Sequence, residues 1–477
     1  MLVSSRYGFH RDELYFIESG HHLAVAEPDN PMLVPYLAAG WHALVGGRLW
    51  AFRILPALSA AGYVLVAGLI ARDLGGRPRH QVAASVATAS TGLVLAAGHL
   101  FSTLTFDMTV SAAALWLLIM AVRTRRWPPW LLAGFVTGIA MEIRMMAIFI
   151  IACCLIAILI MGPRRSLAGP QVWVSAAIAI ALAAPNLIWQ AVHGWPMAQI
   201  ATNIAGGGST SSTPRAALVP EQMLIVGPII IVVAIVGLVW LFDGVRRAEF
   251  GWIGAGYVIF LVIMLVTGGK SYYPAPFIPA LLAAGAIPLL DLVTRRLWRK
   301  IVALVLLIMS AIITANLTLP LWPVGSAGFR VGVAVNPDSA ETVGWDGYIH
   351  TVATVARSIP AARRPTTVII TSNYGEAGAL SRARRLETRD GRRLPPVYSG
   401  HNGFGLWGPP PAGTRTVIMV GEQRPADLRR WFVRCRTVTH LRSPDGVDNG
   451  EAGAPVRLCV DPRRPWPQLW PQLRHLG

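Results

Sequence analysis

The chain has 477 residues, of which 54% are hydrophobic and only 14% are charged, and its mean hydropathy is +0.50. This balance argues against a soluble protein and is typical of a membrane protein with several spans. The formal net charge of +18 does not indicate a nucleic-acid-binding protein. In the first two thirds the basic residues stand in short clusters between apolar runs, which is a membrane-topology pattern rather than a phosphate-binding stripe.

In chain order, the first apolar run, 31–45, is too short to span and is expected to lie flat at the membrane interface. The later runs predict a polytopic α-helical membrane protein with about ten spans. Two of these share the long run 130–161, which Glu142 and Arg144 interrupt. The predicted spans are 49–71, 82–100, 108–122, the two helices within 130–161, 172–189, 221–242, 252–266, 274–293 and 301–319.

Arginine clusters fall at every second connection between these spans. Because short cytoplasmic loops are enriched in Lys and Arg, we expect these connections in the cytoplasm and both ends of the chain outside. The opening segment, Asp107, Glu142, Arg144 and Lys270 then all belong to the outer face. The sequence thus predicts that its chemically active polar residues gather on one side of the membrane.

From about residue 321 the composition becomes that of a soluble domain. Apolar runs predict strands and the segments between them predict helices, which together indicate a small α/β domain. The Gly- and Pro-rich stretch SGHNGFGLWGPPP predicts a long ordered loop within it. The predicted strands are 367–372, 416–420 and 456–460, and the predicted helices are 341–358 and 426–433.

Two domains are therefore expected. Residues 1–320 form a membrane-embedded domain with an external catalytic loop at 1–47, and residues 321–477 form an extracytoplasmic α/β domain. Cys153 and Cys154 lie in an apolar run and are expected in the core. Cys435 and Cys459 lie in the polar C-terminal part, where a disulfide between them is plausible if that part is extracytoplasmic.

The opening segment 7–22, YGFHRDELYFIESGHH, is densely polar and aromatic in a chain that is otherwise apolar. One interpretation is an ordinary polar segment outside the membrane, and the other is a catalytic loop. Asp12 and Glu13 are adjacent, so on a helix they diverge by about 100° and have different roles. Asp107 lies at the outer end of a span, where it is either a cap or salt-bridge residue or faces a cavity.

Arg144 interrupts an apolar run, with Glu142 two residues before it. The pair is either a structural ion pair or, for Arg144, a phosphate contact, which the forked guanidinium suits. Lys270, in GGKSYYPAP, stands beside Tyr272 and Tyr273. Tyrosines at this depth need no special function, but a lone lysine on the face with few cations favours anion binding.

His10, His193 and Trp195 are candidate contacts for a sugar or an acceptor. His193 and Trp195 stand with Asn186 and Gln190 in a polar and aromatic patch suited to stacking a sugar ring. A divalent metal on His10, His21, His22 and His193 is a further possibility, although no HxxxH or HxxE spacing supports it.

Several motifs occur in an order that resembles bacterial members of glycosyltransferase family 39, which are relatives of the protein O-mannosyltransferases and the lipid A aminoarabinose transferase. The motifs are YGFHRDELYF, HLFSTLTFD, APNLIWQAVHGWP, GGKSYYPAPFIP, SNYGEAGAL and SGHNGFGLWGP.

The resemblance implies a GT-C fold and an inverting hexosyl or pentosyl transferase of the plasma (inner) membrane. Such an enzyme takes a sugar from a polyprenyl phosphate, and its acceptor is a protein, a polysaccharide or a glycolipid. Asp12 then matches the catalytic base, with Glu13 beside it, and Asp107 matches the acidic residue of the second external loop. Lys270, with Tyr272 and Tyr273, matches the segment near the lipid phosphate.

Two positions depart from the family pattern. Members normally carry a membrane helix ahead of the loop that contains the two adjacent acidic residues, here Asp12 and Glu13, whereas the printed sequence opens with that loop itself. They also normally carry Lys where this chain has Arg144. A cation is kept at the second position, with a different geometry. A transporter and a catalytically inactive lipid-binding scaffold are the alternative functions.

Overall fold

The computed structural model describes residues 3–207, 212–244 and 246–477. These residues form two compact units. One unit is Arg53–Leu319, and the other combines the N-terminal segment up to Phe52 with Pro320–Gly477. The N-terminal segment thus packs with the C-terminal part of the chain, whereas the sequence suggested a single domain over 1–320.

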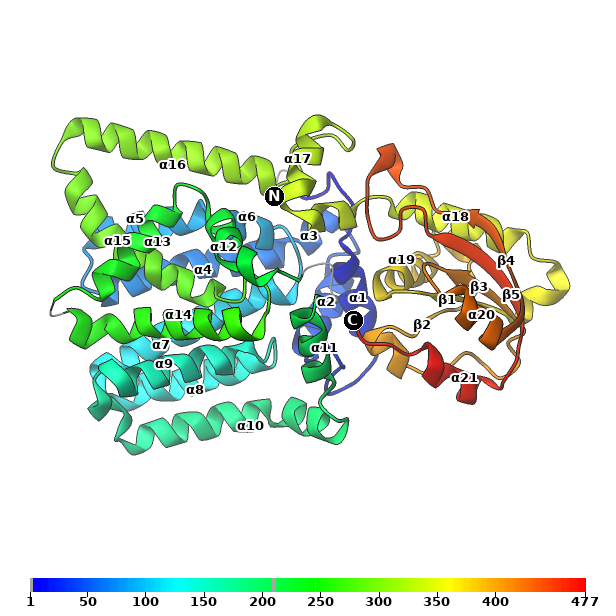
Figure 1. Cartoon of the computed structure of the whole chain (residues 1–477), viewed down its shortest axis with the longest axis horizontal. Coiled ribbons are helices and arrows are strands. Elements are labelled where there is room, and N and C mark those ends of the chain that lie inside the picture. The colour runs from blue at the N-terminus through cyan, green and yellow to red at the C-terminus, as the bar shows by residue number, and fades with distance from the viewer. Residues whose placement is uncertain (1–2, 208–211, 245) are drawn as a thin grey trace. The chain divides into compact units, whose positions relative to one another are not determined.

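The first unit is helical, and Figure 1 shows its long helices running side by side. It consists of α4 (Ile54–Asp73), α5 (Pro78–Ala89), α6 (Gly92–Ala97), α7 (Thr103–Thr124), α8 (Trp127–Met141), α9 (Met146–Met161), α10 (Pro170–Val192), α11 (Pro196–Ala205), α12 (Leu218–Val226), α13 (Ile231–Leu241), α14 (Arg246–Thr267), α15 (Ile278–Val293) and α16 (Leu297–Thr318).

Within the described residues, six helices are long and apolar enough to cross a membrane, or seven if the bent pair α12–α13 is one span. The protein is therefore a multi-pass membrane protein, but the expected count of about ten spans is not confirmed. The run 82–100 breaks between α5 and α6, because the hydroxyls of Ser90 and Thr91 bond the last carbonyls of α5. The run 221–242 bends by 109° at Gly227, and α8 and α9 are shorter than ordinary spans.

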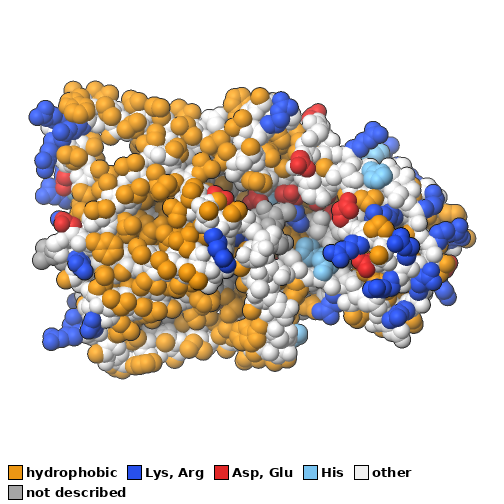
Figure 2. Space-filling view, in the orientation of Figure 1, with side chains coloured by type: hydrophobic (Ala, Val, Ile, Leu, Met, Phe, Trp, Pro, Cys, Tyr) orange, Lys and Arg blue, Asp and Glu red, His pale blue; other side chains and the backbone are white. Residues whose placement is uncertain are grey.

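The basic connections lie together at one end of the helical unit. Figure 2 shows Lys and Arg side chains gathered there, beside a surface that is mostly hydrophobic. Arg123, in the last turn of α7, contacts Asp73 at the end of α4, and Arg79 of α5 contacts Asp291 of α15. These two contacts bring the connection after α4 beside the end of α7 and the start of α5 beside the end of α15, as expected if these basic connections share one side of the membrane.

Small residues let some of these helices pack closely. A Cβ placed on Gly237 of α13 would lie only 1.9 Å from the backbone oxygen of Leu281 in α15. A larger residue at this position would force the two helices apart, so this crossing depends on glycine.

The second unit has an α/β fold. Its helices are α1 (Arg11–Ser19), α2 (Leu33–Leu44), α3 (Leu49–Phe52), α17 (Ala327–Val335), α18 (Trp345–Arg357), α19 (Tyr374–Arg385), α20 (Pro425–Trp431) and α21 (Trp466–Leu473), and its strands are β1 (Thr367–Thr371), β2 (Val397–Ser399), β3 (Thr416–Val420), β4 (Phe432–His440) and β5 (Pro455–Pro462).

The strands form one sheet in the order β2-β1-β3-β5-β4. The first three are parallel, and β5 runs antiparallel to both β3 and β4. A disulfide joins Cys435 of β4 to Cys459 of β5, whereas Cys153 and Cys154 are buried free thiols in the helical unit. The sheet has a separate apolar core on each face, one of which contains Val352 and Leu380 and the other Leu428 and Trp466.

The N-terminal helix α1 belongs to this unit because it completes one of these cores. Leu14 is 3% exposed and lies in the same buried cluster as Leu380 and Ile369. Gly378 of α19 allows the close approach, since a Cβ there would lie 2.9 Å from the Leu14 carbonyl. Burial of one such side chain stabilises by roughly 1.5–3 kcal/mol, so α1 is held as a core element rather than as a loop.

Candidate active site

The first turn of α1 carries Asp12 and Glu13, and it is fixed by a capping box. His10 is the N-cap, and its Nδ1 accepts a hydrogen bond from the Asp12 N–H at 3.1 Å. The Glu13 carboxylate accepts from the His10 N–H at 2.8 Å. Glu13 is fully buried and caps the helix, so of the two adjacent carboxylates only Asp12 projects outward.

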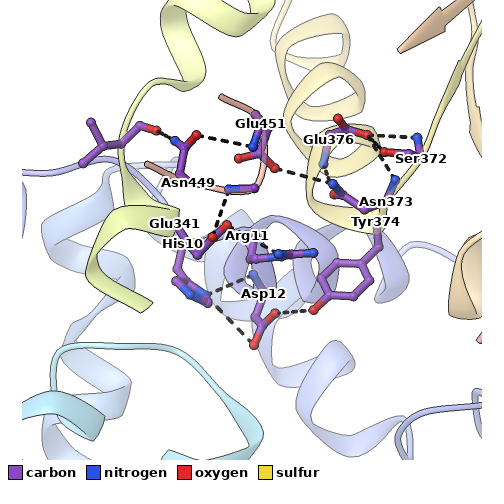
Figure 3. A network of polar contacts seen from close by, with 12 residues as sticks. His10, Arg11, Asp12, Glu341, Ser372, Asn373, Tyr374, Glu376, Asn449 and Glu451 are labelled. Carbon is purple, nitrogen blue, oxygen red and sulfur yellow. Dashed lines mark hydrogen bonds and ion pairs between the residues drawn. The ribbon is translucent and has the colours of Figure 1, made fainter. Parts of the chain in front are cut away.

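Asp12 is the carboxylate of α1 that solvent reaches, with a third of its side chain exposed. Tyr374 of α19 donates its hydroxyl to Asp12 Oδ1 at 2.9 Å (Figure 3). Burial and the charge of Asp12 raise the pKa of Tyr374, which keeps the phenol protonated as a donor. The helix N-terminus and this hydrogen bond both favour the ionised form of Asp12, which is the form that a general base needs.

Arg11 ties this turn to the C-terminal part of the unit. Its guanidinium lies over the Tyr374 ring, 5.0 Å from the ring centre, and Nη1 lies 3.4 Å from Glu341 Oε2. Figure 3 shows these side chains converging on one network. The base candidate is therefore held by residues from distant parts of the sequence, which restricts its rotamers.

The Tyr374 end of α19 rests on a buried carboxyl group. Oε2 of Glu376 accepts hydrogen bonds from the Ser372 N–H and hydroxyl at 2.9 Å and from the Asn373 N–H at 3.1 Å. Burial, and next the nearby Glu451, raise the pKa of Glu376 to about 8. Burial, and next Glu341, likewise raise the pKa of Glu451 to about 7. Glu376 is thus mainly neutral near pH 7 and acts as a structural group.

A second carboxyl pair in this unit did not emerge from the sequence. Tyr15 Oη lies 3.0 Å from Glu27 Oε2 and 2.9 Å from Asp29 Oδ1, and Asn402 donates to Asp29. Burial is the first cause that raises the pKa of both carboxyl groups. The Ser19 hydroxyl also donates to Glu27 Oε2, at 2.9 Å. The only sequence signal was the pair of acidic residues flanking Pro28.

In the helical unit, a separate cluster surrounds Arg144, in the break between α8 and α9. Arg144 Nη2 donates to Thr103 Oγ1 at 2.7 Å, and its guanidinium lies 5.7 Å from the ring centres of both Tyr272 and Tyr273. Lys270 Nζ lies 5.8 Å from the Tyr272 ring centre. The structure therefore brings two cations and two tyrosines together.

Asp107 belongs to the same cluster. It is 4% exposed, it accepts a hydrogen bond from Ser111 at 2.8 Å, and its charge attracts Arg144. The N-cap of α7 is Ser102, so Asp107 is not the cap of its helix. It faces a cation inside the helical unit, which compensates its burial in an apolar surrounding.

Three side chains near the α8–α9 break retain polar atoms without a partner. These atoms are buried yet accept or donate no hydrogen bond within the described residues: Arg144 Nη1, Glu142 Oε1, and both the oxygen and the nitrogen of the Asn186 amide. No ion pair joins Glu142 to Arg144 in the part of the chain that the structure describes. Because buried polar atoms normally have partners, these atoms are available to water or to a polar ligand.

His193 and Trp195 lie at the end of α10. The His193 ring stacks on Trp189 at 4.0 Å, and Trp195 is 44% exposed. Among the described residues, no contact joins either ring to the Arg144 cluster. His21 and His22 lie beyond the end of α1, and His22 stacks on Trp407 at 3.7 Å. In the described ranges, no group of three or more His, Cys, Asp or Glu side chains could hold a metal ion.

Comparison with known proteins gives matches to one family and to solved structures. Residues 29–189 match the family described as dolichyl-phosphate-mannose-protein mannosyltransferase. No curated protein matches by sequence. The chain has the fold of ArnT from Cupriavidus metallidurans. The structure of that protein bound to undecaprenyl phosphate matches with a TM-score of 0.62 and 13% identity, over 96% of this chain and 95% of that one. Its apo structure matches with a TM-score of 0.58 and 13% identity, over 95% and 93%.

Proposed function

We propose that the chain transfers a sugar from a polyprenyl-phosphate donor to an acceptor hydroxyl outside the membrane, because residues 29–189 match a mannosyltransferase family model and the chain shares the fold of an ArnT structure bound to undecaprenyl phosphate. In this reaction the acceptor oxygen forms a bond to the anomeric carbon and inverts it. The bond from that carbon to the lipid phosphate breaks, and the acceptor proton passes to a base. No nucleotide takes part.

Asp12 is the proposed base. A hydroxyl group becomes a better nucleophile as its proton leaves, and a positioned carboxylate accepts that proton. Asp12 is exposed enough to meet a hydroxyl group, and Tyr374 and the first turn of α1 hold it in place. Glu13 supports this turn as a cap and is not assigned a proton-transfer role.

Arg144 and Lys270 are the proposed partners of the lipid phosphate, which leaves with its negative charge. The observation that carries this assignment is the buried Arg144 Nη1, which has no hydrogen-bond partner among the described residues, inside a cluster of two cations and two tyrosines. A phosphate oxygen supplies the missing acceptor, and a charge-assisted bond of this kind strengthens as charge develops on the leaving group. Asp107 then holds Arg144 in place.

The test is Asp12→Asn in the full chain, reconstituted in lipid with labelled polyprenyl-phosphate sugars of known identity. We expect transfer to fall by at least about a hundredfold, because base catalysis contributes on the order of 10²–10⁴. Asp346→Asn is the matched control, since Asp346 is an exposed carboxylate in the first turn of α18. Full activity of Asp12→Asn would contradict the assignment. Movement of the donor across the membrane without release of the lipid phosphate would favour a transporter.

A further inference from the structure

The α/β unit contains a pocket of about 330 Å³ that the proposed chemistry leaves without a role. It lies where the C-terminal end of α1 meets the last turns of α19, strand β2 and the start of the SGHNGFGLWGPPP loop. Its volume is at the lower end of ligand sites, which span roughly 300–1,000 Å³. Its lining residues are Glu18, His22, Ser381, Arg384, Arg385, Pro396, Val397, Tyr398, Phe404, Trp407 and Gly408.

Aromatic rings form one wall of this pocket, and contacts behind them fix their positions. Trp407 stacks in parallel on His22 at 3.7 Å and packs against Phe404 at 4.1 Å. Phe404 in turn stacks with Tyr15 of α1, whose hydroxyl accepts from the Gly403 N–H at 3.1 Å. The loop is therefore anchored on the same helix that carries Asp12, and the wall is preformed.

Polar groups form the rest of the lining, which we call the polar wall. Glu18 is 7% exposed, and its Oε1 accepts a 2.7 Å hydrogen bond from Arg385, while its buried Oε2 has no partner within the described residues. The Tyr398 hydroxyl and the Arg384 guanidinium also make no hydrogen bond in the described part of the chain. An unpaired carboxylate oxygen, a hydroxyl group and a guanidinium can bond sugar hydroxyls and a sugar-borne anion.

The charge balance of this wall decides which saccharide fits. The ion pair with Arg385 neutralises Glu18, so Arg384 remains as an uncompensated cation. The segment 381–393, SRARRLETRDGRR, has six arginines against one Glu and one Asp, so the potential around the pocket is positive. The part of the chain from residue 320 onward has no lysine, and guanidinium groups match planar carboxylates and phosphates particularly well.

We propose that this pocket is a subsite for an acidic saccharide, with sugar rings against the aromatic wall and the acidic group on Arg384. The role of this subsite rests on the proposed function, and the subsite makes that function more specific, because it identifies acidic glycans as the acceptor class. The acceptor is held at the C-terminal end of α1, while Asp12 at the N-terminal end serves the reacting hydroxyl.

The experiment measures binding to the full chain in lipid nanodiscs by calorimetry, with no lipid-linked donor present. The probes are trigalacturonic acid, the neutral trisaccharide maltotriose and inorganic phosphate. Trigalacturonic acid should bind saturably, and Arg384→Gln should weaken it by at least about tenfold, because a charge-assisted hydrogen bond is lost. Tyr398→Phe, which keeps the ring, should weaken it by a few-fold. Arg389→Gln is the matched control, with the same charge change on an exposed residue of the same segment outside the pocket.

Four results would overturn the proposal: equal binding of maltotriose, equal binding of phosphate alone, an equal loss in Arg389→Gln, or no saturable binding of any probe. If Arg384→Gln does not fold, Tyr398→Phe still decides, since unchanged affinity in that variant also counts against the pocket. Because no donor is present, a negative result in this binding assay does not contradict the proposed transfer reaction. Loss of the transfer assignment would likewise leave a measured saccharide site intact.

Discussion

Glu376→Gln tests whether the network beneath Asp12 contains a neutral buried carboxyl group. Burial raises the pKa of Glu376 to about 8, from an ordinary value of 4.5. Between these two values the folded protein holds a proton that the unfolded chain has released. The free energy of unfolding therefore decreases as pH rises from about 4.5 to 8. Glutamine mimics the protonated form and can accept the same bonds from Ser372 and Asn373.

The size of the effect follows from the same pKa. The free energy of unfolding of the wild type falls by about 1.4 kcal/mol per pH unit between these two values. The variant lacks this titration, so at pH 8 it should be more stable than the wild type by on the order of 5 kcal/mol. This figure is a ceiling, since the cluster relaxes when a charge forms. For a domain of 150–250 residues, each kcal/mol moves the unfolding temperature by roughly 2–4 °C. The two proteins should have equal stability near pH 4.5 and diverge above it.

The assay is thermal unfolding of the full chain in nanodiscs, measured from pH 4.5 to pH 9, with the wild type and variant compared at each pH. Glu27 titrates in both proteins, so the difference between the two curves reports Glu376 together with the change that its replacement causes at the neighbouring Glu451. Glu422→Gln is the control, because it removes a carboxylate from an exposed position of the same unit. Parallel curves for the wild type and Glu376→Gln would refute the reasoning.

Three further predictions concern the helical cluster, the support of the base and the sheet. Arg144→Gln should lower kcat/KM for the lipid donor roughly 10–100-fold. Arg144→Lys, which keeps a cation, should retain most of the wild-type kcat/KM. Equal losses in the two variants would argue against a phosphate contact. Tyr374→Phe should lower kcat by about tenfold with little change in the donor KM, since it frees Asp12 without touching the donor; a change confined to KM would contradict this. Replacing Cys435 and Cys459 by Ala should lower the free energy of unfolding by roughly 3 kcal/mol. The unfolding temperature should fall, while transfer is retained at low temperature. An unchanged unfolding temperature would mean that the disulfide does not stabilise the sheet.

The apolar runs predicted most helices of the membrane part, because a span needs a length of hydrophobic chain that few other structures use. They could not predict breaks that depend on local hydrogen bonds, such as the one at Ser90 and Thr91. In the C-terminal part, β1 and β3 were predictable as short buried apolar runs. The edge strand β4 was not, since its exposed arginines hide the pattern of a strand.

The site was predictable where charge stands out from an apolar or ordered background. Asp12, Arg144 and Lys270 meet that condition, and the structure surrounds each with partners. Partners that are distant in sequence were not predictable, because they depend on tertiary packing. Tyr374 had no signal linking it to Asp12, and the close approach at Gly378 that assigns α1 to the α/β unit cannot be read from spacing.

The docking of α1 against α19 also sets an order of events during synthesis. Tyr374 follows Asp12 at a sequence separation of 362, a length that takes roughly 20–70 s to make at about 5–20 residues per second. Throughout that interval, Leu14 has no core to enter, although its helix emerged first. The base candidate thus acquires its support from Tyr374 only after the last helix of the helical unit and the first strand of the sheet have been made.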